Sequence, residues 1–245
     1  MNKGLGLRTY TIIYLIVLYG PIIILPMFAF NDATTVAFPL SGFTTKWFSQ
    51  MLGDANLRKA LVNSLIVSLS TATLATTLGI LAARSAVRYS WPGKGIVMGG
   101  IMVPLVLPEM IVAMSLLVLL LSVGIKLSLF TIILGHVLIC MPFAVAILSS
   151  AFQSLDKSLE EAALDLGETG WSTFRLIVLP LVMPGIMASF LITFTISIDE
   201  FIIANFLGGG EPVLSVFVFT AFRFPRPCRR CWRSGRCWWP SRSCF

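Results

Sequence analysis

Three acidic side chains lie inside stretches of sequence that are otherwise apolar. Glu109 lies within residues 96–123, a stretch that Pro104 and Pro108 are expected to break, and the pair Asp199–Glu200 lies within residues 181–207. A charge near the centre of a bilayer costs at least about 2.5–3.5 kcal/mol, so intramembrane carboxylates usually line the interior of a helix bundle or a wet cavity. There they are suited to binding a positively charged group. The alternative is that Asp199 and Glu200 lie at the outer interface, where they orient a helix or contact another protein.

The composition of the chain indicates that lipid is its solvent. Of its 245 residues, 57% are hydrophobic and only 12% are charged, and the mean hydropathy is +0.90. Soluble domains usually carry about 25% charged residues. The length allows five or six spans of about 20 residues in one membrane domain. We therefore predict an all-α, polytopic transmembrane helical bundle, whose spans cover residues 10–30, 60–83, 96–123, 129–151 and 181–207.

The first apolar stretch predicts an uncleaved span rather than a secretory signal. It is far longer than the apolar part of a signal peptide, which has about 7–15 residues and ends at a small-residue cleavage site. The basic residues of the short loops set the orientation. With the N-terminus in the cytoplasm, the inner segments hold seven Lys or Arg residues and the outer segments four. We expect this orientation, which places residues 153–178 in the cytoplasm.

The polar stretch 153–178 has the pattern of a short helix that begins at a side-chain cap. Ser158-x-x-Glu161 matches a capping box, and Asp156 is a competing N-cap. The helix would carry Glu161 and Asp165 four residues apart on one face. Small residues beside them would allow a partner to approach closely.

A tight turn and a second helix are expected to follow. Gly167 suits the left-handed backbone conformation that ends a helix. Thr169 can cap the second helix, which we expect to stop before Pro180. The prediction is a helix–turn–helix on the cytoplasmic surface between two spans.

At these positions the chain resembles the permease subunits of ABC importers. Their cytoplasmic signature reads E-A-A, three residues, G, nine residues, I-x-L-P. The matching residues, with every spacing kept, are Glu161, Ala162, Ala163, Gly167, Ile177, Leu179 and Pro180. The resemblance covers about residues 10–222, so we assign residues 1–222 to a permease domain.

The resemblance implies the partners and the role of the loop. In that family the first helix of the loop docks into a groove of the ATPase subunit and transmits its closure to the spans. The chain is then a transport subunit of the bacterial cytoplasmic membrane. It is expected to work with two ATPase subunits, a homologous permease and an extracytoplasmic solute-binding protein, and not with nucleic acid.

The sequence predicts no chemistry for the chain itself. It has no G-x-x-x-x-G-K-[ST] phosphate-binding loop, so we do not expect it to bind ATP. It also has no metal-ligand cluster and no nucleophile–base arrangement. We therefore predict no cofactor, no metal and no enzymatic activity in this subunit.

Three stretches resemble the spermidine/putrescine permeases within this family. They are the Asn31 loop leading to Gly42-Phe43-Thr44-Thr45-Lys46-Trp47, Pro104-Leu-Val-Leu-Pro108-Glu109, and Ile198-Asp199-Glu200-Phe201-Ile202. A polyamine is a string of ammonium groups separated by methylenes. It needs spaced carboxylates together with apolar or aromatic walls.

The acidic residues can supply that arrangement. At 1.5 Å per residue, Asp199 lies roughly 27 Å from the cytoplasmic start of its span and Glu109 about 20 Å along its own. Asp199, Glu200 and Glu109 are therefore expected to converge at a mid-to-outer cavity, with Phe201 as an aromatic wall. Polyamine import is the predicted function. The same scaffold serves importers of iron, sulfate or thiosulfate, and phosphonate, so the solute stays open.

Two other classes of function compete with an importer subunit. An ion-coupled secondary transporter would need inverted repeats and would have no ATPase-docking loop. A membrane-anchored interaction protein would bind through a basic tail without transporting. That tail carries the whole net charge of +7, because residues before 221 hold 11 Lys or Arg and 11 Asp or Glu.

The C-terminal tail, residues 223–245, does not fit a permease, which needs a sixth span here. It contains four cysteines. Their spacing begins as C-x2-C, as in a zinc site, but no matching second pair follows, so the spacing does not favour a zinc site. Cysteine is encoded by TGY and tryptophan by TGG. When the codons are read two bases later, the last base of the preceding codon joins the TG of a cysteine codon, and the resulting NTG codon encodes Leu, Met or Val. Read this way, the tail becomes a Leu/Val/Ala run of about 20 residues, long enough to cross a bilayer. We infer a frameshift near codons 225–228; the alternative is a genuine basic tail that binds anionic lipid.

Overall fold

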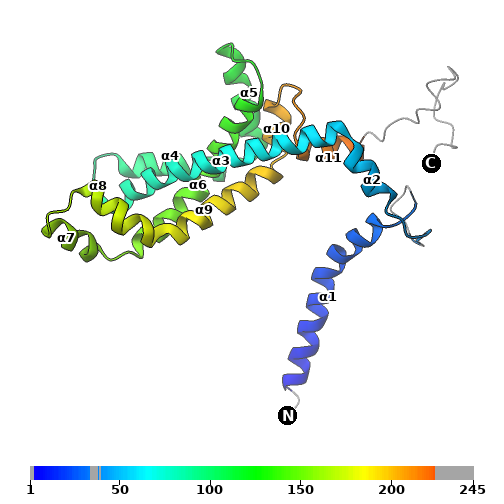
Figure 1. Ribbon diagram of the computed structural model, residues 1–245, viewed down its shortest axis with the longest axis horizontal. Coiled ribbons are helices and arrows are strands. Elements are labelled where there is room, and N and C mark those ends of the chain that lie inside the picture. Colours follow the sequence, from blue (N-terminus) through cyan, green and yellow to red (C-terminus); the bar gives the residue numbers. More distant parts are fainter. Residues whose placement is uncertain (1–2, 34–37, 39, 224–245) are drawn as a thin grey trace. The chain divides into compact units, whose positions relative to one another are not determined.

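The computed structural model describes residues 3–33, 38 and 40–223, and every regular element within these ranges is helical (Figure 1). The predictions for the tail therefore lie outside the described residues, apart from Arg223. The helices are α1 (Lys3–Ala29), α2 (Lys46–Gly53), α3 (Ala55–Arg88), α4 (Lys94–Val106), α5 (Glu109–Ser122), α6 (Leu129–Gln153), α7 (Lys157–Asp165), α8 (Gly170–Thr173), the π-helical turn η1 (Phe174–Val178), α9 (Leu179–Asp199), α10 (Ile202–Leu207) and α11 (Leu214–Arg223).

Four of the described helical stretches are long and apolar enough to cross a membrane. They are Gly6–Ala29, Ala55–Arg88, Leu129–Gln153 and Gly170–Asp199. Helices α4 and α5 reach the required length only as a pair, which is bent by 110°. Counted as one broken span, this pair brings the number to five. The prediction of an all-α, polytopic bundle is confirmed.

The bend between α4 and α5 follows from proline. Leu107 precedes Pro108 and is extended, with φ −83° and ψ 141°, because the proline ring disfavours helical geometry in the residue before it. Pro108 then caps α5, whose first residue is Glu109. A second proline, Pro104, lies within α4. The break predicted in this span is present, and it places Glu109 at a helix N-terminus.

The fifth span ends earlier than the predicted residue 207. Helix α9 ends at Asp199, and Glu200 is extended with φ −67° and ψ 117°. The chain then forms the separate short helix α10. The boundary prediction was wrong because neither proline nor glycine marks this break. A side-chain hydrogen bond, described below, produces it instead.

The second loop helix does not stop before Pro180, contrary to the prediction. Helix α8 continues through η1 into α9, so that residues 170–199 form one helical stretch. A proline ring normally clashes with the carbonyl four residues earlier. The π-helical turn directly ahead of Pro180 widens the helix there, which accommodates the ring.

Residues 56–224 form one compact unit, and residues 1–55 with 225–245 form another. Within the larger unit, α3, α4, α6 and α9 run alongside one another, with α7 and α8 at one end and α5 and α10 at the other (Figure 1). Small residues allow the long helices to pack closely, as is usual in membranes. A Cβ at Gly185 of α9 would lie 2.5 Å from the Cβ of Ala151 in α6, and one at Gly79 of α3 would lie 2.9 Å from that of Ala144. Helix α6 is therefore the centre of this bundle.

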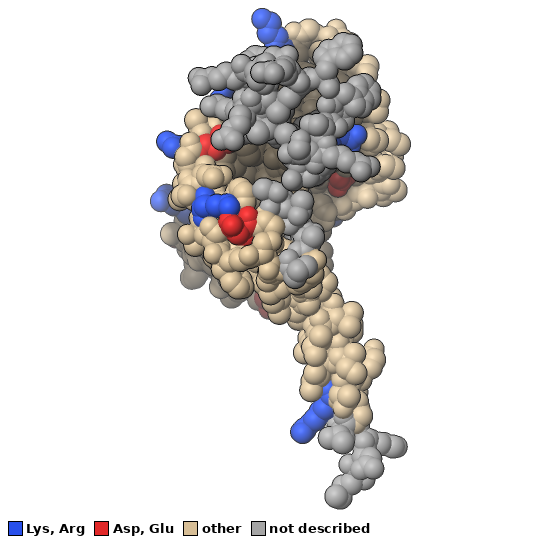
Figure 2. Space-filling model, turned by 90° about the vertical axis from the view of Figure 1, so that its right-hand side faces the viewer, with Lys and Arg blue, Asp and Glu red and all other residues tan. Residues whose placement is uncertain are grey.

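Helix α1 has the surface of a lipid-facing span. Its described side chains are exposed or half-exposed, and most of them are large and apolar. Figure 2 shows the lower column, formed by α1, as almost wholly uncharged, with basic side chains near its lower end. Such a surface is stable in hydrocarbon and not in water.

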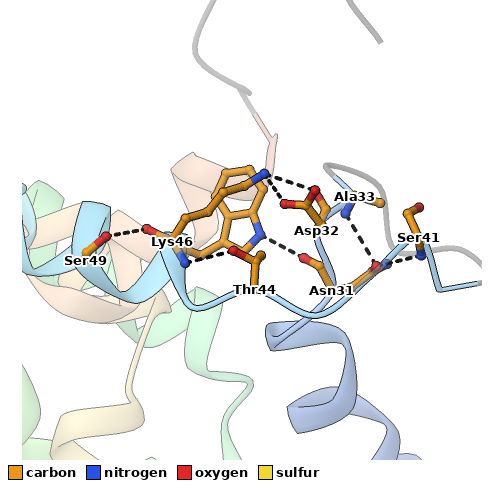
Figure 3. A network of polar contacts seen from close by, with 8 residues as sticks. Asn31, Asp32, Ala33, Ser41, Thr44, Lys46 and Ser49 are labelled. Atoms are coloured by element: carbon orange, nitrogen blue, oxygen red, sulfur yellow. Dashed lines mark hydrogen bonds and ion pairs between the residues drawn. The ribbon is translucent and has the colours of Figure 1, made fainter.

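The loop after α1 is ordered by a polar network around Asn31 (Figure 3). The Asn31 carboxamide oxygen accepts hydrogen bonds from the backbone N–H groups of Ala33 (3.4 Å) and Ser41 (3.0 Å), and its carbonyl accepts one from the Trp47 indole (2.8 Å). Lys46 forms an ion pair with Asp32 and lies 4.7 Å from the centroid of the Trp47 ring. The network closes the loop onto the start of α2.

Candidate functional site

The three predicted carboxylates meet where two helices are interrupted. Glu109 is the first residue of α5, Asp199 is the last residue of α9, and Glu200 links α9 to α10. Helix α10 packs against α5 and α6, which brings the two interruptions together. Glu109 and Asp199 are near enough to Glu200 for their charges to act on it, but of the three carboxylates only Asp199 lines the cavity described below. We call these three residues the carboxylate cluster.

Glu200 is held by hydrogen bonds to neighbouring backbone and side-chain groups. Its Oε1 atom accepts hydrogen bonds from the N–H groups of Ile202 (2.9 Å) and Ile203 (3.2 Å), which are the first two residues of α10. Its own carbonyl accepts one from the Ser215 hydroxyl (2.9 Å). Glu200 therefore caps α10 and creates the break that shortens α9. Glutamate is not among the preferred N-cap residues, which is why sequence reasoning missed this role.

Asp199 faces an open cavity instead. The cavity has a volume of about 410 Å³ and is lined by Ile198, Asp199, Phe201, Leu214, Ser215, Val218, Phe219 and Phe222. The rings of Phe201 and Phe219 are 4.5 Å apart between centroids. The Arg223 guanidinium lies 6.0 Å from the centroid of Phe219, which shows that a cation can rest on this wall. Among the described ion pairs, none involves a residue of the carboxylate cluster.

Most of this aromatic wall was not predicted. Phe201 was expected, but Phe219 and Phe222 belong to α11, which the sequence reading did not identify as a helix. Residues 214–223 are too short for a span, and the apolar run has no cap that marks its start. The relevant signal was the spacing of the two phenylalanines, three residues apart on one helical face.

The predicted loop helix is α7, and Asp156 rather than Ser158 caps it. The Asp156 carboxylate accepts a hydrogen bond from the Ser158 N–H (3.0 Å), and this interaction lowers the pKa of Asp156. Gly167 adopts φ +89° in the turn, a conformation that side-chain-bearing residues rarely take. Thr169 then caps α8 by accepting from the Ser172 N–H (3.2 Å).

The signature residues divide between two places. Glu161, Ala162 and Ala163 lie in α7, where the first two are exposed and Ala163 is buried. Ile177 lies in η1, and Leu179 and Pro180 open α9. The structure thus brings the E-A-A residues and the glycine turn together, and it places the I-x-L-P residues in the helix that leads into the span.

The exposed face of α7 and the following turn is unusually apolar for a polar loop. Leu159 and Leu164 are 44% and 49% exposed, and Leu166 and Trp171 are 87% and 71% exposed. Glu161 and Asp165 lie among them and are also exposed. Exposed apolar side chains that alternate with charged ones are typical of a protein-binding surface. We call these six residues the α7 face.

The inner side of α7 is held by an acidic residue that the sequence reading did not select. Glu160 forms ion pairs with Arg88 (Nε–Oε1 2.7 Å) and Arg84 (Nη2–Oε2 3.6 Å), both near the end of α3. These partners are more than 70 residues apart in the chain. Sequence spacing alone could not pair them, although Arg84 and Arg88 were visible as a basic pair four residues apart.

The fold and these two regions define a class: a multi-pass membrane protein with broken helices at one end and a short helical loop at the other. Residues 75–224 match the family described as "Binding-protein-dependent transport system inner membrane component", and the chain belongs to this family. The match ends where the Arg/Cys/Trp-rich segment begins. The chain is therefore a multi-pass permease subunit of the inner membrane. Membership implies an ATPase and a solute-binding protein as partners.

Individual relatives agree with this assignment. The spermidine/putrescine transport system permease protein PotC of Escherichia coli (strain K12) is 37% identical over 192 residues, which are 78% of this chain and 72% of PotC. The putrescine transport system permease protein PotI of the same strain is 35% identical over 214 residues, covering 84% and 76%. PotC of Haemophilus influenzae is 34% identical, covering 78% and 74%.

A solved structure supports the fold. The crystal structure of a bacterial ABC transporter involved in the import of the acidic polysaccharide alginate contains a chain that matches with a TM-score of 0.74. The alignment covers 95% of this chain and 85% of that one, at 14% identity. At this identity the likeness concerns the arrangement of the helices alone.

Proposed function

We propose that this permease subunit carries polyamines across the membrane, with the carboxylate cluster and the aromatic cavity as its contact with the solute. The observation that carries the proposal is Asp199, an exposed carboxylate at the edge of a cavity walled by Phe201, Phe219 and Phe222. A carboxylate attracts an ammonium group, and phenylalanine rings accommodate both cations and methylenes. The relatives named for spermidine and putrescine transport support the same solute class.

The two helix breaks give the solute a polar path. Broken helices expose unpaired backbone groups, which membrane proteins tolerate where they line a cavity. Transporters commonly bind their solutes at such breaks. The end of α9 presents carbonyl groups beside Asp199 and adds partial negative charge there. Glu109 and Asp199 are the residues that we propose for direct contact, and Glu200 contributes charge while it caps α10.

The α7 face is proposed as the docking surface for the ATPase. Its exposed leucines and Trp171 offer apolar area, and Glu161 and Asp165 offer charges that can select the partner. A complete importer then contains two ATPase subunits, one homologous permease and an extracytoplasmic binding protein. This assembly requires α7 and the N-terminus on the cytoplasmic side, in agreement with the positive-inside rule.

Uptake by the reconstituted importer tests the solute class. Proteoliposomes that contain this chain with its reading frame restored near codons 225–228, the partner permease and the ATPases should accumulate labelled putrescine or spermidine when the binding protein and ATP are present. Omission of the ATPase should abolish uptake, which separates this mechanism from ion-coupled transport. Uptake of sulfate or ferric ion, with no competition by polyamines, would contradict the polyamine assignment and leave the importer class intact.

A further inference from the structure

A buried ion cluster joins the loop to a membrane-spanning helix. The Glu160 carboxylate of α7 lies between Arg88, at 2.7 Å, and Arg84, at 3.6 Å, on the last turns of α3. The three side chains are only 16%, 8% and 18% exposed, respectively. Ion pairs at the surface contribute little, but removal of one partner from a buried pair is strongly destabilising. We call these three residues the clamp.

The clamp also holds the neighbouring segments. The Arg88 guanidinium donates a second hydrogen bond, 3.0 Å long, to the Leu155 carbonyl that follows α6. The Arg84 guanidinium lies 4.4 Å from the centroid of the Phe174 ring, at the start of η1. Leu155 and Phe174 pack against a buried cluster that includes Ala83 and Phe152. One charge cluster therefore contacts the ends of α3 and α6, helix α7 and the start of the α8–η1–α9 helix.

Helix α7 is attached to the bundle on two sides. It packs against α8 and η1, which lead into α9, and of its nine residues only Ala163 is buried. Local caps hold the turns at either end. Toward α3, the described ion pairs of α7 are those of Glu160, so force applied to the α7 face reaches α3 largely through this side chain.

We propose that the clamp is the mechanical link that transmits movement of α7 to α3 and to the α8–η1–α9 helix. This inference rests on the proposed docking of the ATPase at the α7 face. Glu160, Arg84 and Arg88 are positioning residues, because they face the bundle rather than the docking partner. An ATPase that moves α7 would pull both arginines, and with them the end of a helix that crosses the membrane.

The test separates docking from transmission in an importer that transports. Glu160→Gln keeps the shape and removes the charge, whereas Glu168→Gln removes a charge from the exposed turn of the same loop and serves as the control. We expect Glu160→Gln to retain co-purifying ATPase and basal ATP hydrolysis. Solute-stimulated uptake should fall about tenfold, within the usual range of coupling between two sites. Arg88→Lys, which cannot hold Glu160 and the Leu155 carbonyl together, should give an intermediate loss.

A double-mutant cycle tests whether the clamp acts as one unit. Glu160→Gln combined with Arg88→Gln should lower uptake no further than the worse single variant, because either change already breaks the link. Losses that multiply would overturn the proposal, as would uptake in Glu160→Gln within about twofold of the control. If Glu161→Lys abolishes uptake while Glu160→Gln is harmless, only the clamp is refuted. If Glu161→Lys is also harmless, docking at the α7 face fails first.

Discussion

The clamp and the carboxylate cluster lie at opposite ends of the same bundle, and they differ in whether their carboxylates are paired with a positive charge. In the clamp, one carboxylate is paired with two arginines and is shielded from solvent. In the cluster, three carboxylates lie near one another, and no described ion pair neutralises them. A compensated cluster holds helices together, whereas carboxylates without a counter-charge attract a cation. The comparison supports the two proposals made above, a mechanical role for the clamp and a solute-binding role for the carboxylate cluster.

The two regions also differ in whether their helices are continuous or interrupted. Near the clamp, the chain passes from α8 through η1 into α9 without a break, so a displacement can be carried along it. Near the carboxylate cluster, α4–α5 and α9–α10 are both interrupted. Continuous helices transmit movement, and interrupted ones expose polar groups to a solute. The charges and the backbone therefore both support the proposed roles, transmission of movement at the clamp and solute binding at the carboxylate cluster.

The largest expected effect concerns the C-terminal segment, because both regions need a complete bundle to act. We predict that the chain as translated supports only background uptake, since a segment so rich in arginine cannot cross a bilayer. Restoration of the frame near codons 225–228 should bring uptake to the full rate and place the C-terminus in the cytoplasm. Resequencing of the gene and a C-terminal topology reporter are the measurements. Full uptake by the confirmed original frame would show that a sixth span is unnecessary.

Charge reversal on the α7 face should have the next largest effect. Glu161→Lys is expected to lower ATPase co-purification and uptake by about 100-fold, because like charges placed in an interface cost several kcal/mol. Glu168→Gln serves as the matched control in the same loop. Membrane levels are compared by immunoblot, and ATP hydrolysis is measured in proteoliposomes.

Gly167→Val probes the same face without altering a charge. Its φ of +89° is strained for a β-branched residue, although open space surrounds the position. The turn should distort and misplace α7, so that docking weakens while the spans stay inserted. Normal uptake in both Glu161→Lys and Gly167→Val would remove the α7 face from the mechanism.

A single carboxylate at the other end should matter less. Asp199→Asn keeps the size of the side chain but removes its charge and replaces one acceptor oxygen by a donor NH2 group. We expect uptake to fall about tenfold, the effect of one charge-assisted interaction of about 1.5–3 kcal/mol. Asp199→Glu should be milder. The binding protein should bind solute normally in both cases, which is checked by equilibrium dialysis. Equal behaviour of the two variants would mean that Asp199 is not a contact for the solute.

Local sequence signals predicted the parts of the molecule that local interactions determine. The length of the apolar stretches predicted the spans, and the prolines predicted the break before Glu109. Gly167 predicted the turn of the loop, and Thr169 predicted the cap of its second helix. The break at Glu200 and the clamp were missed because each depends on a side chain meeting groups that the pattern does not mark. Glu160 was passed over in favour of Glu161, since only the packing of α7 on α3 decides which of two adjacent glutamates faces inward.

The smallest expected effect separates the two roles of Glu200, which has a place on both sides of the comparison. As a cap, it holds α10 through one oxygen, and glutamine can supply that oxygen without the charge. Glu200→Gln should therefore leave the amide exchange of Ile202 and Ile203 nearly unchanged, whereas Glu200→Ala should expose them and cost about 1 kcal/mol, as the loss of an N-cap usually does. Hydrogen exchange and uptake are measured on the same variants. If Glu200→Gln lowers uptake as much as Asp199→Asn while α10 stays protected, Glu200 belongs with the solute-binding carboxylates. If only Glu200→Ala is impaired, its role is to hold α10 in place.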